Sequence, residues 1–295
     1  MATLRDIRDR IKSVKNTRQI TRAMKLVAGA KLNKATLAAL AARPYQQTLG
    51  RVLGQVVGAV GEEFQHPLLQ PTGNTEVVYV VALSADRGLC GNFNSLVNKA
   101  AELECRRLQG EGKTVKVLAF GKKVRAHLSK RGFDVIGGEV DVDPREYGRV
   151  ADALASRLVE DLHAAAFEQV VLVYNRYESV MVQTPITEVV LPMAITRPAA
   201  PEGDAEAAGP SVDYLFEPDG ASLLGHLLPL SLRTRLLQAL LENQAGEQAK
   251  RMTAMDAATR NASELINRLT LEYNRARQAA ITKELIEIVS GAEAL

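Results

Sequence analysis

An α/β fold is predicted, in which the N- and C-terminal helices pair as an antiparallel coiled coil and the middle of the chain forms a domain with a mainly parallel sheet. Apolar residues recur at helical spacing at both ends of the 295-residue chain, whereas Val- and Ile-rich segments alternate with amphipathic ones in the middle. Aromatic residues make up only 4% and Trp is absent, which favours packed helices over an all-β sandwich. We expect an N-terminal helix over 1–60, a sheet domain over 61–195, a Pro/Gly-rich linker over 196–220 and a C-terminal helix over 221–295.

The N-terminal helix is predicted from a cap and from its apolar spacing. Thr3 and Asp6 have the spacing of a capping box, in which side-chain oxygens bind free backbone N–H groups. Apolar residues follow at intervals of three and four, and then less regularly: Leu4, Ile7, Ile11, Val14, Ile20, Met24, Val27, Leu32, Leu37 and Leu40. Pro44 lacks an N–H donor and should bend the helix unless its neighbours compensate. Beyond it, three glycines recur at intervals of four: Gly50, Gly54 and Gly58. They indicate either a weak helix end or a groove for a second helix.

The middle of the chain alternates predicted strands and helices. The Val- and Ile-rich segments are 75–84, 114–121, 133–136, 169–175 and 179–190. The amphipathic helices predicted between the first four strands are 92–108, 122–130 and 144–166. Alternation of this kind predicts a mainly parallel sheet with covering helices. The last two strands follow each other closely, so we expect them to form an antiparallel edge.

The C-terminal segment has the most regular pattern of the chain. Positions that alternate spacings of four and three form the predicted seam of a coiled coil: Leu241, Ala245, Gln248, Met252, Met255, Thr259, Ala262, Ile266, Leu269, Tyr273, Ala276 and Ala280. Small residues in this seam let two backbones approach closely. We expect a bend at Pro229 and a helix stop at Gly291.

Length determines how the terminal helices are buried. A helix over 4–58 would run about 80 Å and one over 230–290 about 90 Å, at about 1.5 Å per residue. A compact domain of this mass is only about 45 Å across. Because the sheet domain cannot cover either helix, we expect the two to cover each other as an antiparallel rod inside a larger assembly.

The net charge of +3 hides a basic N-terminal block. Residues 1–43 hold 11 Lys or Arg and 2 Asp or Glu, whereas residues 44–221 hold 17 and 24. A block of this kind indicates a partner. The phosphates of a nucleic acid would suit its charge, but residues 1–43 contain no aromatic side chain for base stacking and carry an apolar seam as well. An acidic protein socket explains both properties and is the interpretation we favour.

Several classes of protein are excluded. The longest apolar run, 77–83, has seven residues, against about 20 for a membrane-spanning helix. No apolar stretch follows the first charges, so a secretory leader is not expected. Cys90 and Cys105 cannot make a disulfide framework and suit a reducing compartment.

Three patterns could indicate an enzyme, and each is weak. Residues 110–114 end like a phosphate-binding loop, but Arg stands at 107 where Gly is needed, and a helix precedes where a strand is required. The turn over 84–92 follows the first strand, where dinucleotide-binding folds hold pyrophosphate, but it has only two glycines. A tight connection with an Asp86–Arg87 pair and a buried Cys90 is the plainer interpretation. The histidines are isolated and indicate no metal site: His66, His127, His163 and His226.

Four segments, in order along the chain, form a recognisable set. They are IKSVKNTRQITRAMKLVA over 11–28, SADRGLCGNFN over 84–94, YLFEP over 214–218 and EYNRARQAAITKELIEIVSG over 272–291. Together they strongly resemble the gamma subunit of F-type ATP synthases. The segments lie near both ends and in the middle, so the resemblance covers essentially the whole chain.

The resemblance implies a fold and a role. The fold is an antiparallel coiled coil of the terminal helices with a Rossmann-like domain that lacks a nucleotide site. The chain would be a non-catalytic rotor shaft, without a cofactor, that carries rotation of the membrane c-ring to the three catalytic beta subunits of a proton-translocating F-type ATP synthase. Implied partners are the three alpha and three beta subunits of the catalytic head, the epsilon subunit and the c-ring. With no transit peptide before the first helix, we expect a peripheral protein on the cytoplasmic face of a bacterial inner membrane.

The resemblance also implies contact residues. Contacts with the catalytic head are implied for Met24, Lys25, Arg277, Gln278, Thr282 and Glu284. Contacts with the c-ring loops are implied for Tyr214 and Glu217. The tip over 286–295 has no Lys or Arg, as expected of a bearing in an apolar sleeve. Each of these residues has an ordinary alternative as the flank of a coiled coil.

Two departures and one rival interpretation accompany the resemblance. The chain has no cysteine-bearing insert of the chloroplast type, so thiol regulation is not implied. Its Pro/Ala/Gly-rich stretch over 197–210 differs from the family's core. The rival is a Rossmann-like nucleotide-binding enzyme with helical arms, which requires the 86–92 turn to hold phosphate. A nucleic-acid-binding protein is a third class, supported by the charge of the N-terminal helix but not by any aromatic side chain in it.

Overall fold

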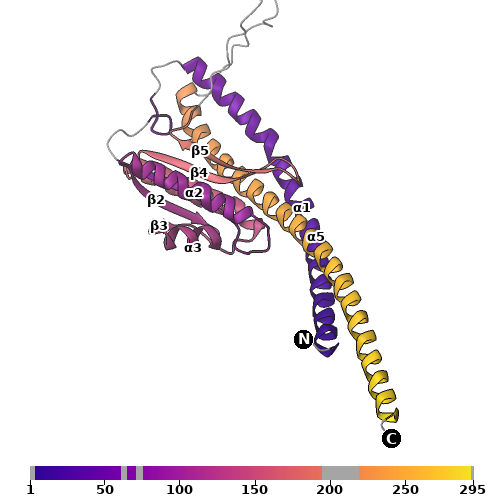
Figure 1. Ribbon diagram of the computed structural model, residues 1–295. Helices are drawn as coiled ribbons and strands as arrows, with labels where there is room; N and C mark the ends of the chain where they lie inside the picture. The colour runs from indigo at the N-terminus through magenta and orange to yellow at the C-terminus, as the bar shows by residue number, and fades with distance from the viewer. Residues whose placement is uncertain (1–3, 61–64, 71–75, 195–218, 294–295) are drawn as a thin grey trace, which may run out of the picture. The chain divides into compact units, whose positions relative to one another are not determined.

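The structure, a computed structural model, describes residues 4–60, 65–70, 76–194 and 219–293. The helices are α1 Leu4–Val60, α2 Phe93–Gly110, α3 Lys122–Lys130, α4 Tyr147–His163 and α5 Gly220–Glu293, with a short 3-10 helix η1 Pro144–Glu146 before α4. The strands are β1 Val77–Leu83, β2 Thr114–Phe120, β3 Asp134–Gly137, β4 Gln169–Tyr177 and β5 Gln183–Leu191. Long terminal helices and a mostly parallel sheet confirm the predicted fold class (Figure 1).

Two compact units divide the chain. The first holds residues 1–31 and 251–295, and the second holds residues 32–250. The division cuts both long helices, so α1 and α5 each belong to both units. The predicted linker lies outside the described residues except at 219–220, and so does Thr3, the expected helix cap.

The second unit is built on a five-stranded sheet with the order β3-β2-β1-β4-β5. The first four strands pair in parallel, and β5 lies antiparallel to β4 at one edge, as the short link between them predicts. The prediction starts the last strand at 179, whereas β5 begins at Gln183. Residues 179–182 form the hairpin turn instead, in which the N–H of Ser179 donates to the carbonyl of Val182 over 3.1 Å.

Alternate side chains of the sheet face two separate cores. Val78 and Val80 of β1 pack with residues of α2 and α3. Tyr79 and Val81 of the same strand pack with α4 and with the parts of α1 and α5 that lie in this unit. In Figure 1, α2 lies in front of the sheet and α5 passes behind it. The sheet therefore covers one end of each long helix. The argument from length predicts that the sheet domain covers neither helix, so a larger part of α1 and α5 is packed on the sheet than expected.

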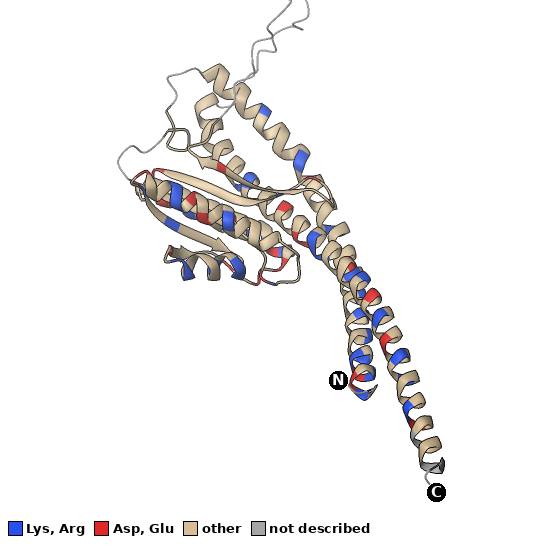
Figure 2. Ribbon diagram, in the orientation of Figure 1, with Lys and Arg blue, Asp and Glu red and all other residues tan. Residues whose placement is uncertain are grey.

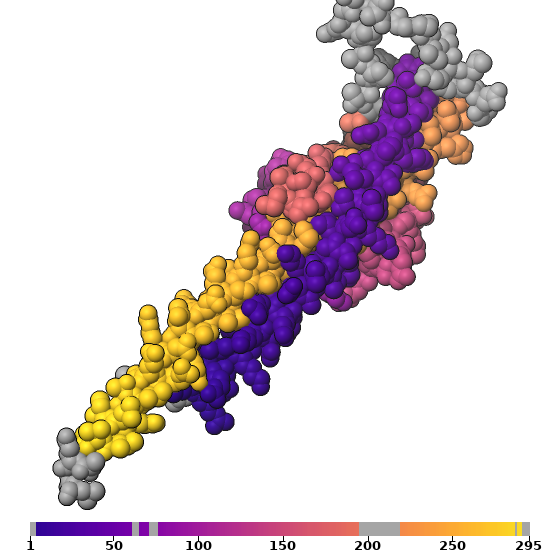
Figure 3. Space-filling model, turned by 90° about the vertical axis from the view of Figure 1, so that its right-hand side faces the viewer, coloured from indigo at the N-terminus to yellow at the C-terminus, as the bar shows by residue number. Residues whose placement is uncertain are grey.

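In the first unit, the start of α1 and the end of α5 run antiparallel and side by side (Figure 3). The polar contacts that join them, in order, are Arg8 with Tyr273 at 2.8 Å, Thr21 with Thr259 at 2.8 Å and Lys25 with Asp256 at 2.6 Å. As the residue number rises along α1, the partner's number falls along α5 by nearly equal steps. The predicted antiparallel pairing is confirmed over this stretch.

The predicted seam of α5 is confirmed by its burial. None of its positions from Leu241 to Ala280 is exposed, whereas Arg260 and Arg268 between them are. The seam positions Ala262, Ile266 and Leu269 are at most 7% exposed. A strict spacing of four and three thus identifies the buried face of this helix.

The predicted seam of α1 is only partly confirmed after Val14. Of the large apolar residues assigned to it there, Leu32 is buried and Met24 is half-buried, but four are exposed: Ile20, Val27, Leu37 and Leu40. Small residues are buried in place of these four: Thr21, Ala28, Ala35 and Ala39. Because side chains three and four residues apart share one face of a helix, continuing the interval from Val14 leads to these small residues and to Leu32.

Helix-breaking residues interrupt the long helices less than predicted. Pro44 stands inside α1 and Pro229 inside α5, and α5 continues past the predicted stop at Gly291 to Glu293. The apolar turns beside both prolines are buried in the sheet core, including Leu49 and Leu228. Packing of this kind outweighs the intrinsic preference of single residues.

The glycines at the end of α1 do not form a continuous groove. Gly54 is buried, but Gly50 and Gly58 are exposed and have no neighbouring atom within 4 Å of a Cβ position. The helix runs on past all three to Val60. Only the middle glycine therefore lies where a second element packs closely.

Ala28→Leu is expected to destabilise the coiled coil of the first unit. Ala28 is 1% exposed, and the neighbouring Gly29 has Met252 Sδ at 3.5 Å from its Cβ position, so a larger side chain must push the helices apart. Overpacking of this kind costs about 1–3 kcal/mol. Chemical denaturation followed by circular dichroism measures it, with the exposed Ala30→Leu as control. An equal effect of the two substitutions would contradict the close helix approach.

Candidate functional site

The turn after β1 is the first candidate site, because it has the position of the pyrophosphate site in doubly wound folds. In the structure, the turn binds the free N–H groups at the start of α3. Asp86 Oδ1 accepts from the N–H of Lys122 and Ser84 Oγ from the N–H of Val124, each over 2.9 Å. Both side chains of the turn thus cap the neighbouring helix α3. The helix that directly follows β1, where a doubly wound fold would hold pyrophosphate, is α2.

The side chain of Asn94 forms hydrogen bonds within the turn and stabilises its conformation. Asn94 Oδ1 accepts the N–H of Ala85 over 3.0 Å, and Asn94 Nδ2 donates to the Arg87 carbonyl over 3.2 Å. The same amide nitrogen lies 3.2 Å from Cys90 Sγ, and this thiol is buried as expected. Asp86 bound to the α3 backbone holds the turn, rather than the expected Asp86–Arg87 pair.

Helix α5 fills the crevice at the carboxyl ends of β1 and β4, where ligands bind in folds of this topology. Asn243 Nδ2 donates to the Ser84 carbonyl just past β1, and Asn243 Oδ1 accepts the N–H of Asn175 in β4, both over 3.5 Å. One turn further, a Cβ on Gly246 would lie 3.1 Å from the ring of Phe93. Asn243 is 6% exposed and Asn175 is 1% exposed. Protein atoms thus occupy the space that a nucleotide would need.

The loop over 110–114 has the reversed geometry that the sequence predicts. Helix α2 ends at Gly110 and β2 begins at Thr114, so no helix start faces a phosphate here. Lys113, which would reach the phosphates in a true phosphate-binding loop, forms an ion pair with Glu168 instead. The loop is a connection held by a partly buried ion pair.

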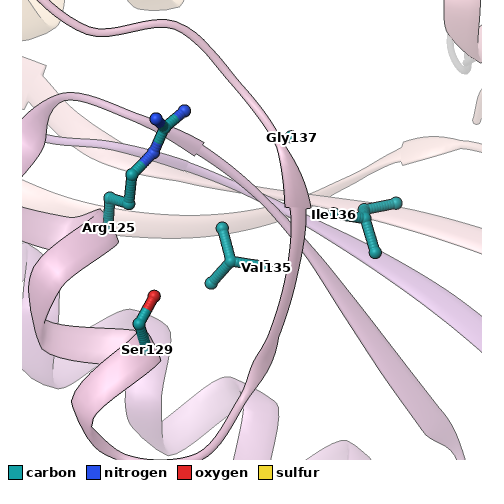
Figure 4. Close-up of a pocket in the computed structure, with 5 residues that line it drawn as sticks. All are labelled: Arg125, Ser129, Val135, Ile136 and Gly137. Carbon is teal, nitrogen blue, oxygen red and sulfur yellow. The ribbon is translucent and has the colours of Figure 1, made fainter.

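A shallow pocket lies at the sheet edge between α3 and β3 (Figure 4). Its lining residues are Arg125, Ser129, Val135, Ile136 and Gly137. Arg125 Nη2 donates to the Gly138 carbonyl over 2.6 Å, which engages the one charged group of the pocket in the fold itself. The lining residues offer no paired acid and base and no activated nucleophile, so they do not support catalysis.

In the described parts of the chain, no group of three or more His, Cys, Asp or Glu side chains could hold a metal ion. No helix among these residues is long and apolar enough to cross a membrane.

Basic side chains mark α1 along the surface of the first unit (Figure 2). The exposed cations of the first unit on α1 are Arg5, Arg8, Arg10, Lys12, Lys15, Arg22 and Lys31. Arg8 also lies with its guanidinium carbon 5.7 Å from the centre of the Tyr273 ring on α5. The apolar seam faces α5 while the charges face away, which matches the two properties expected of this helix.

The predicted head contacts on α1 are Met24 and Lys25, and both are half-buried. Lys25 Nζ donates to Asp256 Oδ1 on α5 over 2.6 Å, and this bond lowers the pKa of Asp256 below its ordinary value. The side chain of Lys25 stays 42% exposed. The residue is thus both part of the coiled coil and present at its surface.

The predicted head contacts on α5 are all exposed: Arg277, Gln278, Thr282 and Glu284. Tyr273 already lies beside Arg8 near the start of α1, so the later turns of α5 extend past the described part of α1. An interval of four places Gln278 and Thr282 on one face, and an interval of seven places Arg277 and Glu284 on another. The structure therefore separates these four residues into two pairs.

The same turns of α5 carry an exposed apolar face. Its residues are 49% to 68% exposed: Ile281, Leu285, Ile286, Ile288 and Val289. An apolar surface of this extent on a single helix indicates a binding partner. Tyr214 and Glu217, the predicted c-ring contacts, lie outside the described residues.

Comparison with known proteins identifies the family. A family model described as ATP synthase matches residues 3–295. Over 306 aligned residues the chain is 46% identical to the ATP synthase gamma chain of Rhizobium rhizogenes, with 100% of both chains covered. The chain belongs to the ATP synthase gamma-chain family. Its identity to the gamma chain of Paracoccus denitrificans is also 46%, over 300 residues and with 100% of both chains covered.

Solved structures share the fold of this gamma-chain family member at low sequence identity. A chain of the Euglena gracilis mitochondrial ATP synthase, in a structure of OSCP, F1 and c-ring, matches with a TM-score of 0.64 and 17% identity, covering 99% of this chain and 94% of that one. A chain of the Tetrahymena thermophila mitochondrial ATP synthase, from its central stalk and c-ring, matches with a TM-score of 0.58 and 22% identity, covering 81% and 99%. The resemblance inferred from the four motifs is confirmed, and its gamma-chain relatives are named as a subunit of ATP synthase.

Sequence reasoning missed the residues that join distant elements. Asp256 follows the seam position Met255, and it could have been paired with Lys25 only once the antiparallel alignment of the helices was known. Asn243 and Gly246 flank the seam position Ala245, but nothing in the heptad pattern indicates that they meet the sheet. A polar residue and a glycine beside a buried small residue are the only signals that the sequence offers.

Gly246→Ala is expected to destabilise the chain by about 1–3 kcal/mol, because its methyl group would be forced against the buried Phe93 ring. Gly225→Ala on the same helix is the matched control. Gly225 is exposed and has no atom within 4 Å of a Cβ position, so alanine should stabilise the helix by about 0.5–1 kcal/mol. Thermal or chemical denaturation measures both. Stabilisation by Gly246→Ala would contradict the filled crevice.

Proposed function

We propose that this chain is the rotor shaft of a proton-translocating F-type ATP synthase. It passes the rotation of the membrane c-ring to the three catalytic beta subunits of the head and has no catalytic residue of its own. The observation that carries the proposal is the match to ATP synthase gamma chains over the full length of both chains. The crevice filled by Asn243 and Gly246 supports it, because a shaft needs no nucleotide site.

Coupling in this proposal comes from the unequal faces of the coiled coil. A ligand shifts a conformational equilibrium only if it binds the alternative states unequally. Helix α1 presents a row of cations, whereas the exposed end of α5 is apolar. Three identical beta subunits around these helices each meet a different face, so their three sites are held in different states. Rotation of the shaft exchanges those states in turn.

The basic face of α1 suits an acidic partner. Unlike hydrogen bonds, charge attraction acts over several ångströms and tolerates sliding. Acidic lever segments of the beta subunits are therefore the partners proposed for this face. Met24 and Lys25 lie where such a segment passes, and the remaining exposure of Lys25 supports this assignment.

The apolar end of α5 suits a sleeve that permits rotation. Ile281, Leu285 and Ile288 recur at spacings of four and three on one side of the helix, and all are about half exposed or more. Apolar contacts are not directional, so they can hold a turning helix without fixing its angle. We assign this end to the bearing within the head, and we assign Arg277, Gln278, Thr282 and Glu284 to its polar contacts with a loop of the head.

The second unit is assigned to the foot of the shaft. Its partners are the epsilon subunit and the c-ring, with Tyr214 and Glu217 at the c-ring loops. The related gamma chains of Rhizobium rhizogenes and Paracoccus denitrificans are bacterial. The proposed location is accordingly the cytoplasmic face of the bacterial inner membrane, as a peripheral subunit.

The rival proposal, a nucleotide-binding enzyme, requires the 86–92 turn to hold phosphate and the crevice beside β1 to be free. Asn243 occupies the crevice, and Asp86 of the turn is bound to the backbone of α3. Micromolar binding of ATP or NAD by the isolated chain, measured by calorimetry, would favour the rival and overturn the rotor proposal.

Gln278→Ala combined with Thr282→Ala tests the assigned contacts with the head. Both side chains are exposed, so the chain should fold normally while ATP turnover by the complex reconstituted with alpha and beta subunits falls by about threefold or more. Asn267→Ala, an exposed change on the paired part of α5, serves as the control and should leave turnover unchanged. Equal turnover by all three complexes would refute the assignment.

Lys25→Gln and Asp256→Asn together separate a role in the coiled coil from a role at the head. The folded chain holds the pKa of Asp256 low, so the ion pair stabilises the coiled coil above the ordinary Asp pKa and is lost as pH falls through the lowered value. Both variants should therefore melt slightly below the native chain at pH 7, and level with it once the pH has fallen below the lowered pKa of Asp256.

If Lys25 also contacts the head, Lys25→Gln alone should lower ATP turnover by the reconstituted complex, by about threefold. Asp256→Asn is the matched control, because it breaks the same pair and leaves the cation in place. Identical turnover by the two variants would restrict Lys25 to the coiled coil and remove it from the head contacts.

A further inference from the structure

A polar cluster joins α1, α5 and the end of β4 within the second unit; its Arg43 side chain is 34% exposed, whereas its acceptor Glu242 is buried. Arg43 of α1 donates to Glu242 Oε1 of α5 through Nη2 over 3.2 Å and through Nε over 3.4 Å. The same Nη2 donates to the carbonyl of Tyr177, the last residue of β4, over 2.8 Å. Gln238 Nε2 donates to Glu242 Oε1 over 2.7 Å and to the Ala39 carbonyl of α1 over 3.4 Å. We call these five residues the Arg43 clamp.

Stability alone explains the Arg43 clamp poorly. The Glu242 side chain is 7% exposed and Gln238 is 3% exposed, so a carboxylate and an amide have been taken out of water. Glu242 Oε2 and Gln238 Oε1 are buried without a hydrogen-bond partner in the described structure. Apolar side chains of similar volume often serve a buried site as well as an ion pair does, or better. The cluster therefore supplies something that apolar packing cannot.

The Arg43 clamp adds hydrogen bonds, whose strength depends on the angle between the groups that they join. Around it the two helices bury apolar side chains, small ones such as Ala35 on α1 and large ones such as Leu236 on α5, and apolar contacts are not directional. Hydrogen bonds of a planar guanidinium weaken steeply when their angles change. Arg43 uses one such group to bind both the other helix and the sheet. Neither helix can turn about its axis relative to the sheet without breaking these bonds.

We propose that the Arg43 clamp fixes the angular position of α1 and α5 on the sheet, so that torque applied to the second unit passes into both helices without slip. This inference rests on the proposed rotor function. Arg43, Gln238 and Glu242 are positioning residues in it: they act through the helices that they hold and do not touch the reacting groups.

The double variant Arg43→Met/Glu242→Met tests the proposal in the complete ATP synthase, reconstituted in lipid vesicles. It replaces the ion pair by apolar side chains of similar size, so the chain should fold and melt close to the native chain. The number of protons transported per ATP hydrolysed should fall by about threefold or more, while hydrolysis itself stays within a factor of about two. A purely structural role would change melting and leave the proton-to-ATP ratio alone.

Lys113→Met/Glu168→Met is the matched control. It removes another partly buried ion pair of the second unit, one that joins β-strand ends and involves neither long helix. Its proton-to-ATP ratio should equal that of the native complex. A native ratio in the Arg43→Met/Glu242→Met complex as well would overturn the clamp.

A second variant keeps the test decisive if the double variant fails to fold. Arg43→Lys keeps the positive charge but has no planar fork to bind the helix and the sheet together. Its proton-to-ATP ratio should fall by about half, and an unchanged ratio would again refute the proposal. If the native complex itself couples no proton transport to ATP hydrolysis, the rotor function fails instead, so the two failures are distinguishable.

Discussion

Packing of α1 along α5 is the constraint on which the rest of the structure depends. In the first unit, no described element other than these two helices contributes to the fold, so each can bury its apolar seam only against the other. Small side chains such as Ala28 and Ala262 make this possible, because they let the backbones approach closely. With their seams used in this way, both helices keep their outer faces for partners: cations on α1 and apolar residues at the end of α5.

The packing of α5 also explains why the described sheet has no open crevice at its carboxyl edge. A parallel sheet with helices on both faces usually keeps an open crevice at its carboxyl edge, and enzymes of this topology place their ligand there. Here α5 enters that crevice with Asn243, and Ser84 and Asp86 beside it bind the first N–H groups of α3. The crevice that binds a ligand in those enzymes is therefore occupied by a helix of this chain.

Much of this architecture could be predicted from the sequence, because the spacing of apolar residues reflects which face of a helix or strand is buried. The strands alternate with amphipathic helices, and the seam of α5 keeps its spacing from Leu241 to Ala280 through both units. The seam of α1 was harder to predict, since Ala28 and Ala35 carry little hydrophobic signal beside the larger but exposed Val27 and Leu37. The spacing of residues along the helix decides which side chains are buried. The size of an apolar side chain is a poor guide where two helices pack closely, because only small side chains fit between them.

The candidate site could be predicted only in part, for a different reason. Motif resemblance indicates which residues face partners, and the exposure of Gln278 and Thr282 is compatible with that role. Contacts such as Arg43 with Glu242 join positions far apart in the chain, and neither helix pattern specifies which turns meet. The roles of Tyr214 and Glu217 stay predictions, as do all contacts with other subunits.

The Thr21–Thr259 contact has a consequence for the assembly of the coiled coil. Two hydroxyls lie 2.8 Å apart in this seam, and Thr21 is only 9% exposed. If one helix slid past the other by seven residues, the heptad pattern would still match, but each hydroxyl would face an apolar neighbour. Together with the Arg8–Tyr273 and Lys25–Asp256 contacts, this buried pairing therefore distinguishes the correct alignment from its nearest competitors.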